Sequence, residues 1–262
     1  MMSKLLSVAA AAILSLGLAS FDSAQTTVPA APTTLRIAAA SDLRFALDEV
    51  MTSFRALHPA INIDATYGSS GNFFAQIRQG GPFDVFLSAD SEYTRRLFAE
   101  GMTEAPFPYA IGKLALVVRK DTGIDPKGFG DLLKSASIRR IAIANPAHAP
   151  YGRAAEAAMK SWKVYDAVAG KLVLGDNVSQ AAQFVDTGAA QAGLIALALV
   201  KAKGSEFAFA EVPETAYPAI DQAGVVVKQS GVLESARTFQ KYLTSEAGRA
   251  ILTRYGFGLP QR

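Results

Sequence analysis

Four short turns constrain the fold of this chain more than any other feature. Each follows an apolar, strand-like run and precedes apolar residues at helical spacing. The turns are Ala40-Ser41-Asp42, Gly68-Ser69-Ser70-Gly71-Asn72, His148-Ala149-Pro150-Tyr151-Gly152 and Asp176-Asn177-Val178-Ser179. An apolar run, a turn and a helix together make a strand–helix unit. Repeated units of this kind are typical of mainly parallel sheets that helices cover on both faces, so the sequence predicts an α/β fold.

The first units illustrate the prediction. "TTLRIAAAS" is strand-like up to Ser41, and apolar residues then recur at helical spacing as far as His58-Pro59. The helix is expected to end there because proline disfavours a helical conformation of the preceding residue. "INIDATY" predicts a second strand, and Gly80-Gly81-Pro82 ends the helix that follows the glycine-serine turn.

The strand–helix units fall into two blocks. This organisation fits either one doubly wound sheet or two lobes joined by extended crossovers. Residues 111–119 and 219–228 are β-rich and lie between the blocks, so they are the expected crossovers of a two-lobed chain. In that arrangement the C-terminal helix pair, from Val232 onward, packs back on the first lobe. The pattern alone leaves both possibilities open.

Composition excludes several classes of function. The chain has 262 residues, of which half are apolar and 19% are charged, as in folded soluble domains. Its net charge is +3 with acids and bases mixed throughout, and it lacks the basic stripe of a nucleic-acid-binding protein. It has no cysteine, which excludes disulfides, thiolate metal sites, a thiol nucleophile and a lipid-modified cysteine.

The N-terminus has the pattern of a secretory signal peptide. Lys4 precedes an apolar stretch from Leu5 to Leu18, and small residues follow. We expect residues 1–24 to be a signal peptide that is cleaved between positions 19 and 24. The apolar stretch is short for a membrane span, and no later stretch resembles one. The sequence therefore predicts an exported, periplasmic protein without a stable membrane anchor.

The chemistry of the four turns favours an anion site. The first backbone N–H groups of a helix lack acceptors within the helix, and the helix dipole favours negative charge at that end. In open α/β sheets, ligands bind beyond the carboxyl ends of the strands, which is where these turns lie. Taken singly, Ser41, Ser70 or Ser179 is better explained as an ordinary helix cap than as a ligand contact. The glycine-serine turn also lacks the lysine of a phosphate-binding P-loop.

Enzymatic chemistry has little support. A secreted hydrolase that uses His148 with Ser41 or Ser70 is an alternative, but the sequence has no G-x-S-x-G elbow. Two histidines without an H-E-x-x-H motif do not favour a zinc site. Asp84 and Asp90, together with Asp42, are candidates for a metal or acid–base cluster, although caps at strand ends and helix starts explain them more simply. We expect no enzymatic activity.

Seven stretches give the chain a resemblance to a known family. They are "IAAASDL", "YGSSGNFFAQI", "GGPFDVFLSAD", "IAIANPAHAPYGRAA", "LVLGDNVSQAAQFV", "AGLIA" and the closing "YGF". They run from about Leu35 to Phe257, and in this order the chain resembles the periplasmic molybdate-binding proteins of bacterial molybdate ABC transporters.

The resemblance implies an architecture and a function. The architecture is the two-lobed periplasmic-binding-protein fold of type II, with a mainly parallel sheet flanked by helices in each lobe and a ligand cleft between them. Residues 33–112 and 223–262 would form the first lobe, and residues 113–222 the second. The implied function is capture of molybdate, and of tungstate, for delivery to a membrane permease. The protein would be a monomer, with no cofactor and no nucleic-acid partner.

The resemblance also implies a set of ligand-binding residues. Ser41 and Ser70 would donate hydrogen bonds from the first lobe, with the backbone N–H of Asp42 as an addition. Tyr151 and Val178 would complete the shell from the second lobe, Val178 through its backbone N–H. These groups would bind the oxygen atoms of the anion, and no residue would bind a metal cation directly.

Two departures from the family pattern affect the site. Some members have a tyrosine in the strand where this chain has Ala196, and an alanine where this chain has Tyr151. We therefore expect the tyrosine hydroxyl to have moved from one loop to the other.

The second departure is Asp42, since a carboxylate beside a dianion is repulsive. Its side chain is expected to turn outward and to interact with the helix dipole. An inward carboxylate would instead suit a ligand that carries a proton, such as phosphate. Another tetrahedral oxyanion, sulfate or phosphate, is thus an alternative ligand.

Overall fold

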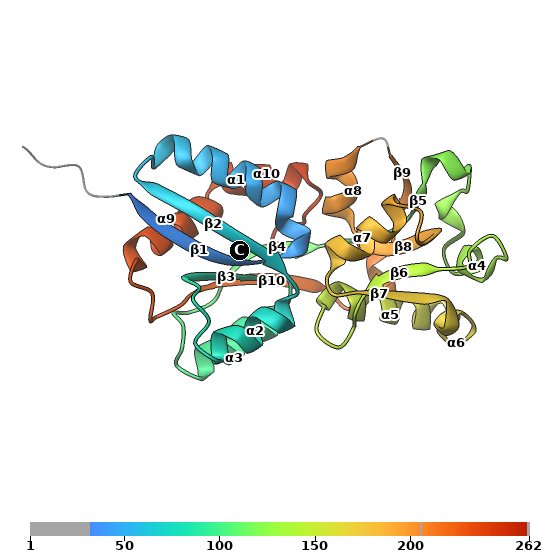
Figure 1. Cartoon of the computed structure of the whole chain (residues 1–262), viewed down its shortest axis with the longest axis horizontal. Coiled ribbons are helices and arrows are strands. Elements are labelled where there is room, and N and C mark those ends of the chain that lie inside the picture. Colours follow the sequence, from blue (N-terminus) through green and yellow to red (C-terminus); the bar gives the residue numbers. More distant parts are fainter. Residues whose placement is uncertain (1–31, 205, 261–262) are drawn as a thin grey trace, which may run out of the picture. The chain divides into compact units, whose positions relative to one another are not determined.

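The computed structural model describes residues 32–204 and 206–260. The expected signal peptide, residues 1–24, lies outside these ranges. The described residues form two five-stranded sheets, each flanked by helices (Figure 1).

The first sheet has the strand order β2-β1-β3-β10-β4. Strands β1 and β2 are parallel, as are β1 and β3, whereas β10 runs antiparallel to both of its neighbours. The sheet is therefore mainly parallel with one reversed strand. Its strands are β1 (Thr33–Ala40), β2 (Ile61–Gly68), β3 (Val85–Ser88), β4 (Phe107–Gly112) and β10 (Ile220–Val226).

The second sheet repeats this plan with the order β7-β6-β8-β5-β9. Strand β6 is parallel to β7 and β8, and β5 runs antiparallel to β8 and β9. Its strands are β5 (Leu114–Arg119), β6 (Ile141–Ala144), β7 (Leu172–Gly175), β8 (Ala192–Ala196) and β9 (Phe207–Glu211). In each sheet, the reversed strand is the first strand that forms after the chain crosses from the other lobe.

Helices cover the sheets. Those of the first lobe are η1 (Ser41–Leu43), α1 (Arg44–Leu57), α2 (Ser70–Arg78), α3 (Ser91–Ala99), α9 (Leu233–Leu243) and α10 (Glu246–Arg254). Those of the second lobe are η2 (Lys120–Thr122), η3 (Pro126–Gly128), α4 (Phe129–Lys134), α5 (Pro150–Ser161), α6 (Tyr165–Val168), η4 (Ala169–Lys171), α7 (Val178–Asp186), α8 (Leu197–Lys203) and η5 (Glu214–Ala216).

Each face of the first sheet has its own hydrophobic core. Side chains of β1 alternate between the faces, so that Ile37 packs in one core and Ala38 in the other. Helices α1, α9 and α10 contribute to the first of these cores, whereas α2 and α3 contribute to the second. The short central strands β3, β6 and β8 are buried along their whole length, which is why their sequences are continuous apolar runs without alternation.

The chain crosses between the lobes at two described places. Only Lys113 separates β4 of the first sheet from β5 of the second. The chain returns before β10, which begins at Ile220, so the expected lobe boundary after residue 222 falls inside that strand. The C-terminal helices α9 and α10 pack on the first lobe.

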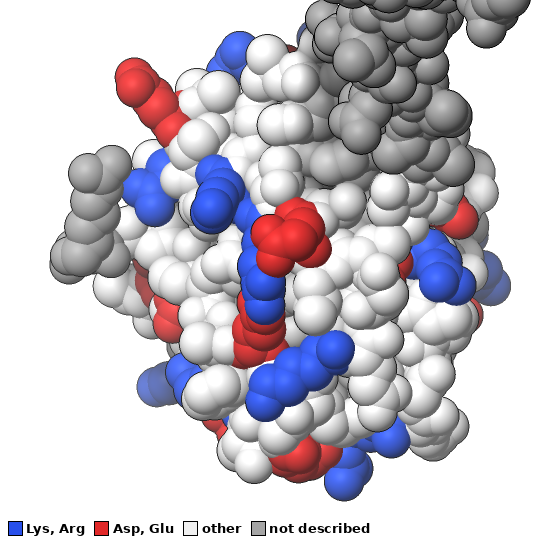
Figure 2. Space-filling view, turned by 90° about the vertical axis from the view of Figure 1, so that its left-hand side faces the viewer, with Lys and Arg blue, Asp and Glu red and all other residues white. Residues whose placement is uncertain are grey.

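The surface shows mixed charge. On the face drawn in Figure 2, basic and acidic side chains are interspersed among uncharged residues and form no large patch of one sign. Within residues 32–204 and 206–260, the helices are too short or too polar to cross a lipid bilayer.

Candidate functional site

Four helical segments begin around one small cavity between the lobes. Helix η1, which continues into α1, begins at Ser41, α2 at Ser70, α5 at Pro150 and α7 at Val178. Their first-turn N–H groups and dipoles favour a negative occupant. The cavity is lined by Ala40, Ser41, Asp42, Gly68, Ser69, Ser70, Ala89, Ala149, Pro150, Tyr151 and Val178.

The cavity is narrow and carries no positively charged side chain. The volume open to the centre of a water molecule is about 10 Å³. That is about the room that one buried water needs. Among the described residues that line it, none is Lys, Arg or His. A solute held here is therefore compact and meets no basic side chain.

Two serine hydroxyls face the cavity with their protons uncommitted. The Ser70 hydroxyl oxygen accepts a hydrogen bond from the backbone N–H of Ala89 at 2.9 Å. The Ser41 hydroxyl oxygen accepts one from the backbone N–H of Ser179 at 3.3 Å. A hydroxyl has one proton and two lone pairs, so each serine can accept these bonds and still donate its proton. Neighbouring Ser69 has a different role, because it caps α2 by accepting from the N–H of Asn72.

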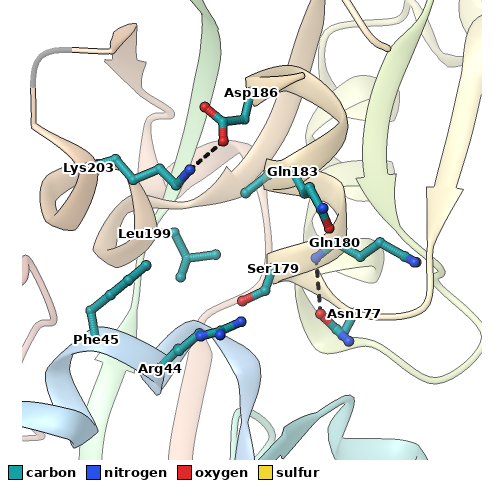
Figure 3. A pocket seen from close by; sticks show the side chains of 10 residues that line it. Arg44, Phe45, Asn177, Ser179, Gln180, Gln183, Asp186, Leu199 and Lys203 are labelled. Carbon is teal, nitrogen blue, oxygen red and sulfur yellow. Dashed lines mark hydrogen bonds and ion pairs between the residues drawn. The ribbon is translucent and has the colours of Figure 1, made fainter. Parts of the chain in front are cut away.

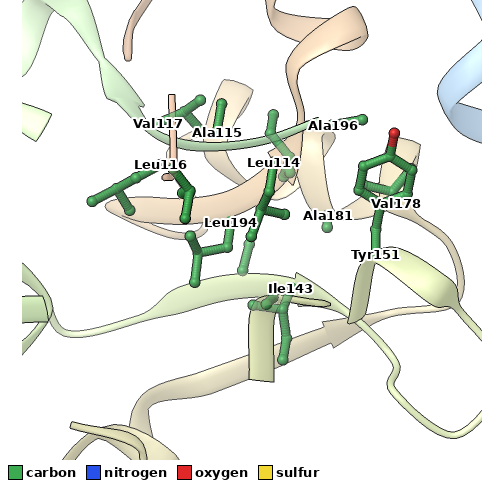
Figure 4. Close-up of a cluster of buried hydrophobic side chains, with 14 of the residues drawn as sticks. Leu114, Ala115, Leu116, Val117, Ile143, Tyr151, Val178, Ala181, Leu194 and Ala196 are labelled. Atoms are coloured by element: carbon green, nitrogen blue, oxygen red, sulfur yellow. The ribbon is translucent and has the colours of Figure 1, made fainter. Parts of the chain in front are cut away.

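Two backbone N–H groups of the second lobe complete the set of donors. Val178 is the first residue of α7 and Tyr151 the second residue of α5, so the N–H of neither has an acceptor within its own helix. Both side chains are almost fully buried and lie at the edge of the second lobe's apolar cluster (Figure 4). This packing fixes the two helix starts at the cavity.

The Asp42 side chain lies inside the protein, so the expectation that it turns outward is wrong. The residue is 1% exposed. Its Oδ2 accepts hydrogen bonds from the Tyr151 hydroxyl at 3.0 Å and from the Gln222 side-chain amide at 2.6 Å. Its Oδ1 is buried and has no hydrogen-bond partner among the described residues. The Tyr151 hydroxyl proton is thus engaged by Asp42.

Burial changes the acidity of this carboxyl group. Removal from water raises the pKa of Asp42 from 3.8 to about 6, and the hydrogen bonds from Gln222 and Tyr151, with the backbone N–H groups of Asp42 and Leu43, oppose this rise only in part. The carboxylate in turn raises the pKa of the Tyr151 hydroxyl, which burial also raises.

Gln222 belongs to the site but was absent from the sequence-based set. Its amide donates to Asp42 and lies 3.4 Å from the Tyr151 hydroxyl. Gly112, at the crossover, makes room for these groups, since a Cβ there would lie 2.4 Å from the tyrosine oxygen. The sequence offers one signal for Gln222: it is a polar residue at a position of the strand that faces inward. It is buried, whereas the preceding Asp221 is exposed and the rest of β10 is apolar.

Direct contacts between the lobes close the cavity. The Ser179 hydroxyl donates to the backbone oxygen of Ser41 at 2.8 Å. The N–H of Gly71 donates to the backbone oxygen of His148 at 2.9 Å. Outside the cavity, Arg153 of α5 forms an ion pair with Asp90 of the first lobe. The structure therefore represents a closed arrangement of the two lobes.

The structure does not assemble the residues of the hydrolase alternative. His148 Nδ1 lies 2.9 Å from the hydroxyl oxygen of Ser69, rather than from Ser41 or Ser70. Within the described residues, no hydrogen bond joins His148 to a carboxylate that could orient it. The histidine instead ties the loop before α5 to the cap of α2.

The three candidate aspartates are held apart by different partners. Asp84 accepts hydrogen bonds from the backbone N–H of Arg36 and the hydroxyl of Ser230. Asp90 caps α3 and pairs with Arg153, whereas Asp42 lies at the cavity. In the part of the chain that the structure describes, no cluster of acidic residues and histidine is arranged to hold a metal ion.

A larger groove lies between α1, α7 and α8. Arg44 follows the first turn closely in sequence, and its side chain lines this groove, with Phe45 and Ser179 (Figure 3). On the same groove Lys203 is paired with Asp186. Both basic side chains lie in a groove that includes the start of α7, and neither lines the small cavity.

A small, donor-lined cavity between two α/β lobes, without a basic side chain, is typical of a solute-binding protein. Comparison with known proteins agrees: residues 35–258 match the family model of bacterial extracellular solute-binding proteins. The chain is 37% identical over 195 residues to the molybdate-binding protein ModA of Rhodobacter capsulatus, and the alignment covers 73% of this chain and 75% of that protein. It is 32% identical over 229 residues to ModA of Azotobacter vinelandii, and that alignment covers 86% of this chain and 90% of the relative.

A solved structure shows the same fold. The periplasmic molybdate-binding protein of Azotobacter vinelandii matches with a TM-score of 0.81 and 29% identity, over 87% of this chain and all of that one. The chain belongs to the bacterial extracellular solute-binding protein family. The expected two-lobed type II fold is confirmed, as is the expectation of a binding protein rather than an enzyme.

Proposed function

We propose that this chain is a periplasmic binding protein that captures molybdate or tungstate between its lobes and delivers the anion to the permease of an ABC transporter. The molybdate-binding function of its relatives supports the ligand. The signal-like N-terminus supports the location. The single observation that carries the proposal is the convergence of four helix starts on one small cavity without a basic side chain.

The donors available at the cavity suit a tetrahedral oxyanion. We assign the hydroxyls of Ser41 and Ser70 and the backbone N–H groups of Asp42, Tyr151 and Val178 to its oxygen atoms. A hydrogen bond to a charged acceptor contributes about 1.5–3 kcal/mol. Roughly five such donors offset much of the cost of removing a dianion from water. The Tyr151 hydroxyl acts on the anion only through Asp42, which it already contacts.

Size contributes to selectivity. The donors are fixed by packed helix starts, so the cavity favours one ionic radius, and tungstate, which is close to molybdate in size, is accepted with it.

Ligand binding stabilises the closed arrangement because the donors come from both lobes. The closed surface is what a permease would recognise, and the proposed protein acts as a monomer without a cofactor. Phosphate remains a second candidate ligand, because the inward carboxyl group of Asp42 could accept the proton that phosphate carries at neutral pH.

Thermal unfolding with a panel of anions tests the proposal. We expect molybdate and tungstate to raise the melting temperature, by the equivalent of about 4 kcal/mol at a free concentration near 1,000 times Kd. Sulfate should have little effect. In Ser70→Ala the shift should be smaller, because one donor is lost, whereas Ser137→Ala, on the surface of the second lobe, should behave as the parent. No shift with molybdate or tungstate would refute the proposal, and a shift with phosphate alone would replace the ligand.

A further inference from the structure

Asp42 presents an electrostatic problem that the other cavity residues do not. Its carboxyl group lines the cavity, is 1% exposed and has one oxygen, Oδ1, without a partner among the described residues. An ionised carboxylate at this position would repel a dianion in a medium that screens charge poorly. The site is therefore compatible with a dianion only if the negative charge of Asp42 is removed.

We propose that Asp42 binds the oxyanion as a neutral carboxylic acid, whose Oδ1 carries a proton and donates it to an oxygen atom of the anion. Capture of a fully deprotonated dianion then takes up one proton from solution. This inference rests on the proposed function and identifies Asp42 as a residue that determines which oxyanion is retained.

The hydrogen bonds around the carboxyl group place the proton. Oδ2 already accepts from two donors, the Tyr151 hydroxyl and the Gln222 amide. A proton on Oδ2 would compete with these donors, whereas a proton on Oδ1 leaves both bonds intact. The unpaired oxygen is thus the one that gains a donor function when the group is neutral.

Among residues 32–204 and 206–260, no group that lines the cavity or contacts Asp42 supplies a compensating positive charge. Tyr151 on α5 and Tyr109 on β4 are neutral phenols with raised pKa values, for which burial is the largest cause. Gln222 on β10 is an uncharged amide, and the Arg44 side chain lines the outer groove rather than the cavity. His148, before α5, is directed to Ser69. Protonation of Asp42 is the remaining way to neutralise the site, and burial already raises its pKa to about 6.

A neutral acid in the cavity discriminates by basicity as well as by size. A hydrogen bond strengthens when its acceptor oxygen binds protons more strongly. Molybdate and tungstate oxygens are more basic than those of sulfate, so the Asp42 proton favours the first two. The other cavity donors are hydroxyl and backbone N–H groups, which are far weaker acids than a carboxylic acid and respond less to this difference.

Calorimetric titration of the full chain with molybdate between pH 7 and pH 9 tests the proposal. Titrations at each pH in two buffers of different ionisation enthalpy give the number of protons taken up. We expect about one proton per bound anion, and Kd rising about tenfold for each pH unit, because one proton is linked to binding. Molybdate itself does not titrate in this range.

Variants assign the proton to Asp42. Asp42→Asn keeps an acceptor for Tyr151 and a neutral donor but cannot titrate, so its Kd should not change with pH and its proton uptake should be close to zero. Its preference for molybdate over sulfate should also fall. Asp221→Asn removes an exposed carboxylate one residue from Gln222, and His148→Gln removes the imidazole that contacts Ser69 across the closed interface. Both controls should retain the pH slope of the parent.

The outcomes separate this inference from the proposed function. Molybdate binding with a constant Kd and no proton uptake would overturn the role of Asp42 and leave the proposed function standing. Absence of molybdate binding at every pH would overturn both. Tight phosphate binding without proton uptake would show that Asp42 is an ionised acceptor of the ligand's own proton, and would also overturn the inference.

Discussion

At the scale of single residues, the cavity serines show how one side chain serves both the fold and the site. The Ser70 hydroxyl accepts a backbone hydrogen bond from Ala89 and so holds the end of β3 against the start of α2. The same bond orients the hydroxyl and leaves its proton for a ligand. Asp42 differs, since its position at the cavity makes the empty protein less stable when the carboxyl group is ionised.

The stability cost of Asp42 gives a prediction with a definite sign. The pKa of the carboxyl group is about 6 in the folded protein and near 3.8 when the group is in water, so the folded state holds its proton to higher pH. Stability is therefore lost as pH rises from about 4 to about 6. At about 1.4 kcal/mol for each pKa unit, the loss is about 3 kcal/mol.

Chemical denaturation of ligand-free Asp42→Asn and its parent should show this difference. We compare the free energy of unfolding of the variant with that of the parent. This difference should shift in favour of the variant by about 3 kcal/mol between pH 3.5 and pH 7, because the amide does not titrate. Asp221→Asn, which changes an exposed carboxylate, should follow the parent. A difference between variant and parent that does not depend on pH would contradict the origin of the shift in Asp42.

At the scale of elements, the glycine-serine turn brings the start of α2 against the second lobe. A Cβ on Gly71 would lie 2.7 Å from the backbone oxygen of His148, which also accepts the Gly71 N–H. Glycine is therefore required here for approach between the lobes, since any larger residue would meet backbone atoms.

Gly71→Ala should keep the fold but oppose closure. We expect its Kd for molybdate to rise by about tenfold or more, which corresponds to at least about 1.4 kcal/mol, while its circular dichroism spectrum stays unchanged. Gly170→Ala is a matched control, because a Cβ at that position meets no atom within 4 Å. Equal affinity in Gly71→Ala and the parent would mean that this contact does not limit closure.

At the scale of the whole molecule, local pattern predicted the elements, but contacts between distant segments decided the details of the site. Each strand–helix turn is formed by consecutive residues, so the sequence predicts the starts of α2 and α7 to within a residue or two. The predicted orientation of the Asp42 side chain is wrong because the actual orientation depends on Tyr151 and Gln222, which are 109 and 180 positions away in sequence. The ion pair between Arg153 and Asp90 likewise had no local signal.

That ion pair provides a prediction about lobe closure. Arg153→Gln should release molybdate about two- to fivefold faster, because a partly exposed pair contributes only about 0.2–1 kcal/mol. The effect should shrink at high salt, where charges are screened. Stopped-flow measurement of dissociation tests this. Lys160→Gln, which breaks a pair within α5 itself, should leave the rate unchanged. An equal rate in both variants would show that the pair between the lobes does not hold them together.

The reversed strands have a consequence for the order in which the chain can fold. Strand β10 lies between β3 and β4, although more than a hundred residues separate β4 from β10 in sequence. Until it is in place, β3 and β4 expose edges that would accept another strand. Sheets that depend on such distant pairing form slowly. The first lobe therefore cannot be completed while the chain is still emerging, and a fragment that ends before Ile220 should aggregate rather than fold as an independent unit.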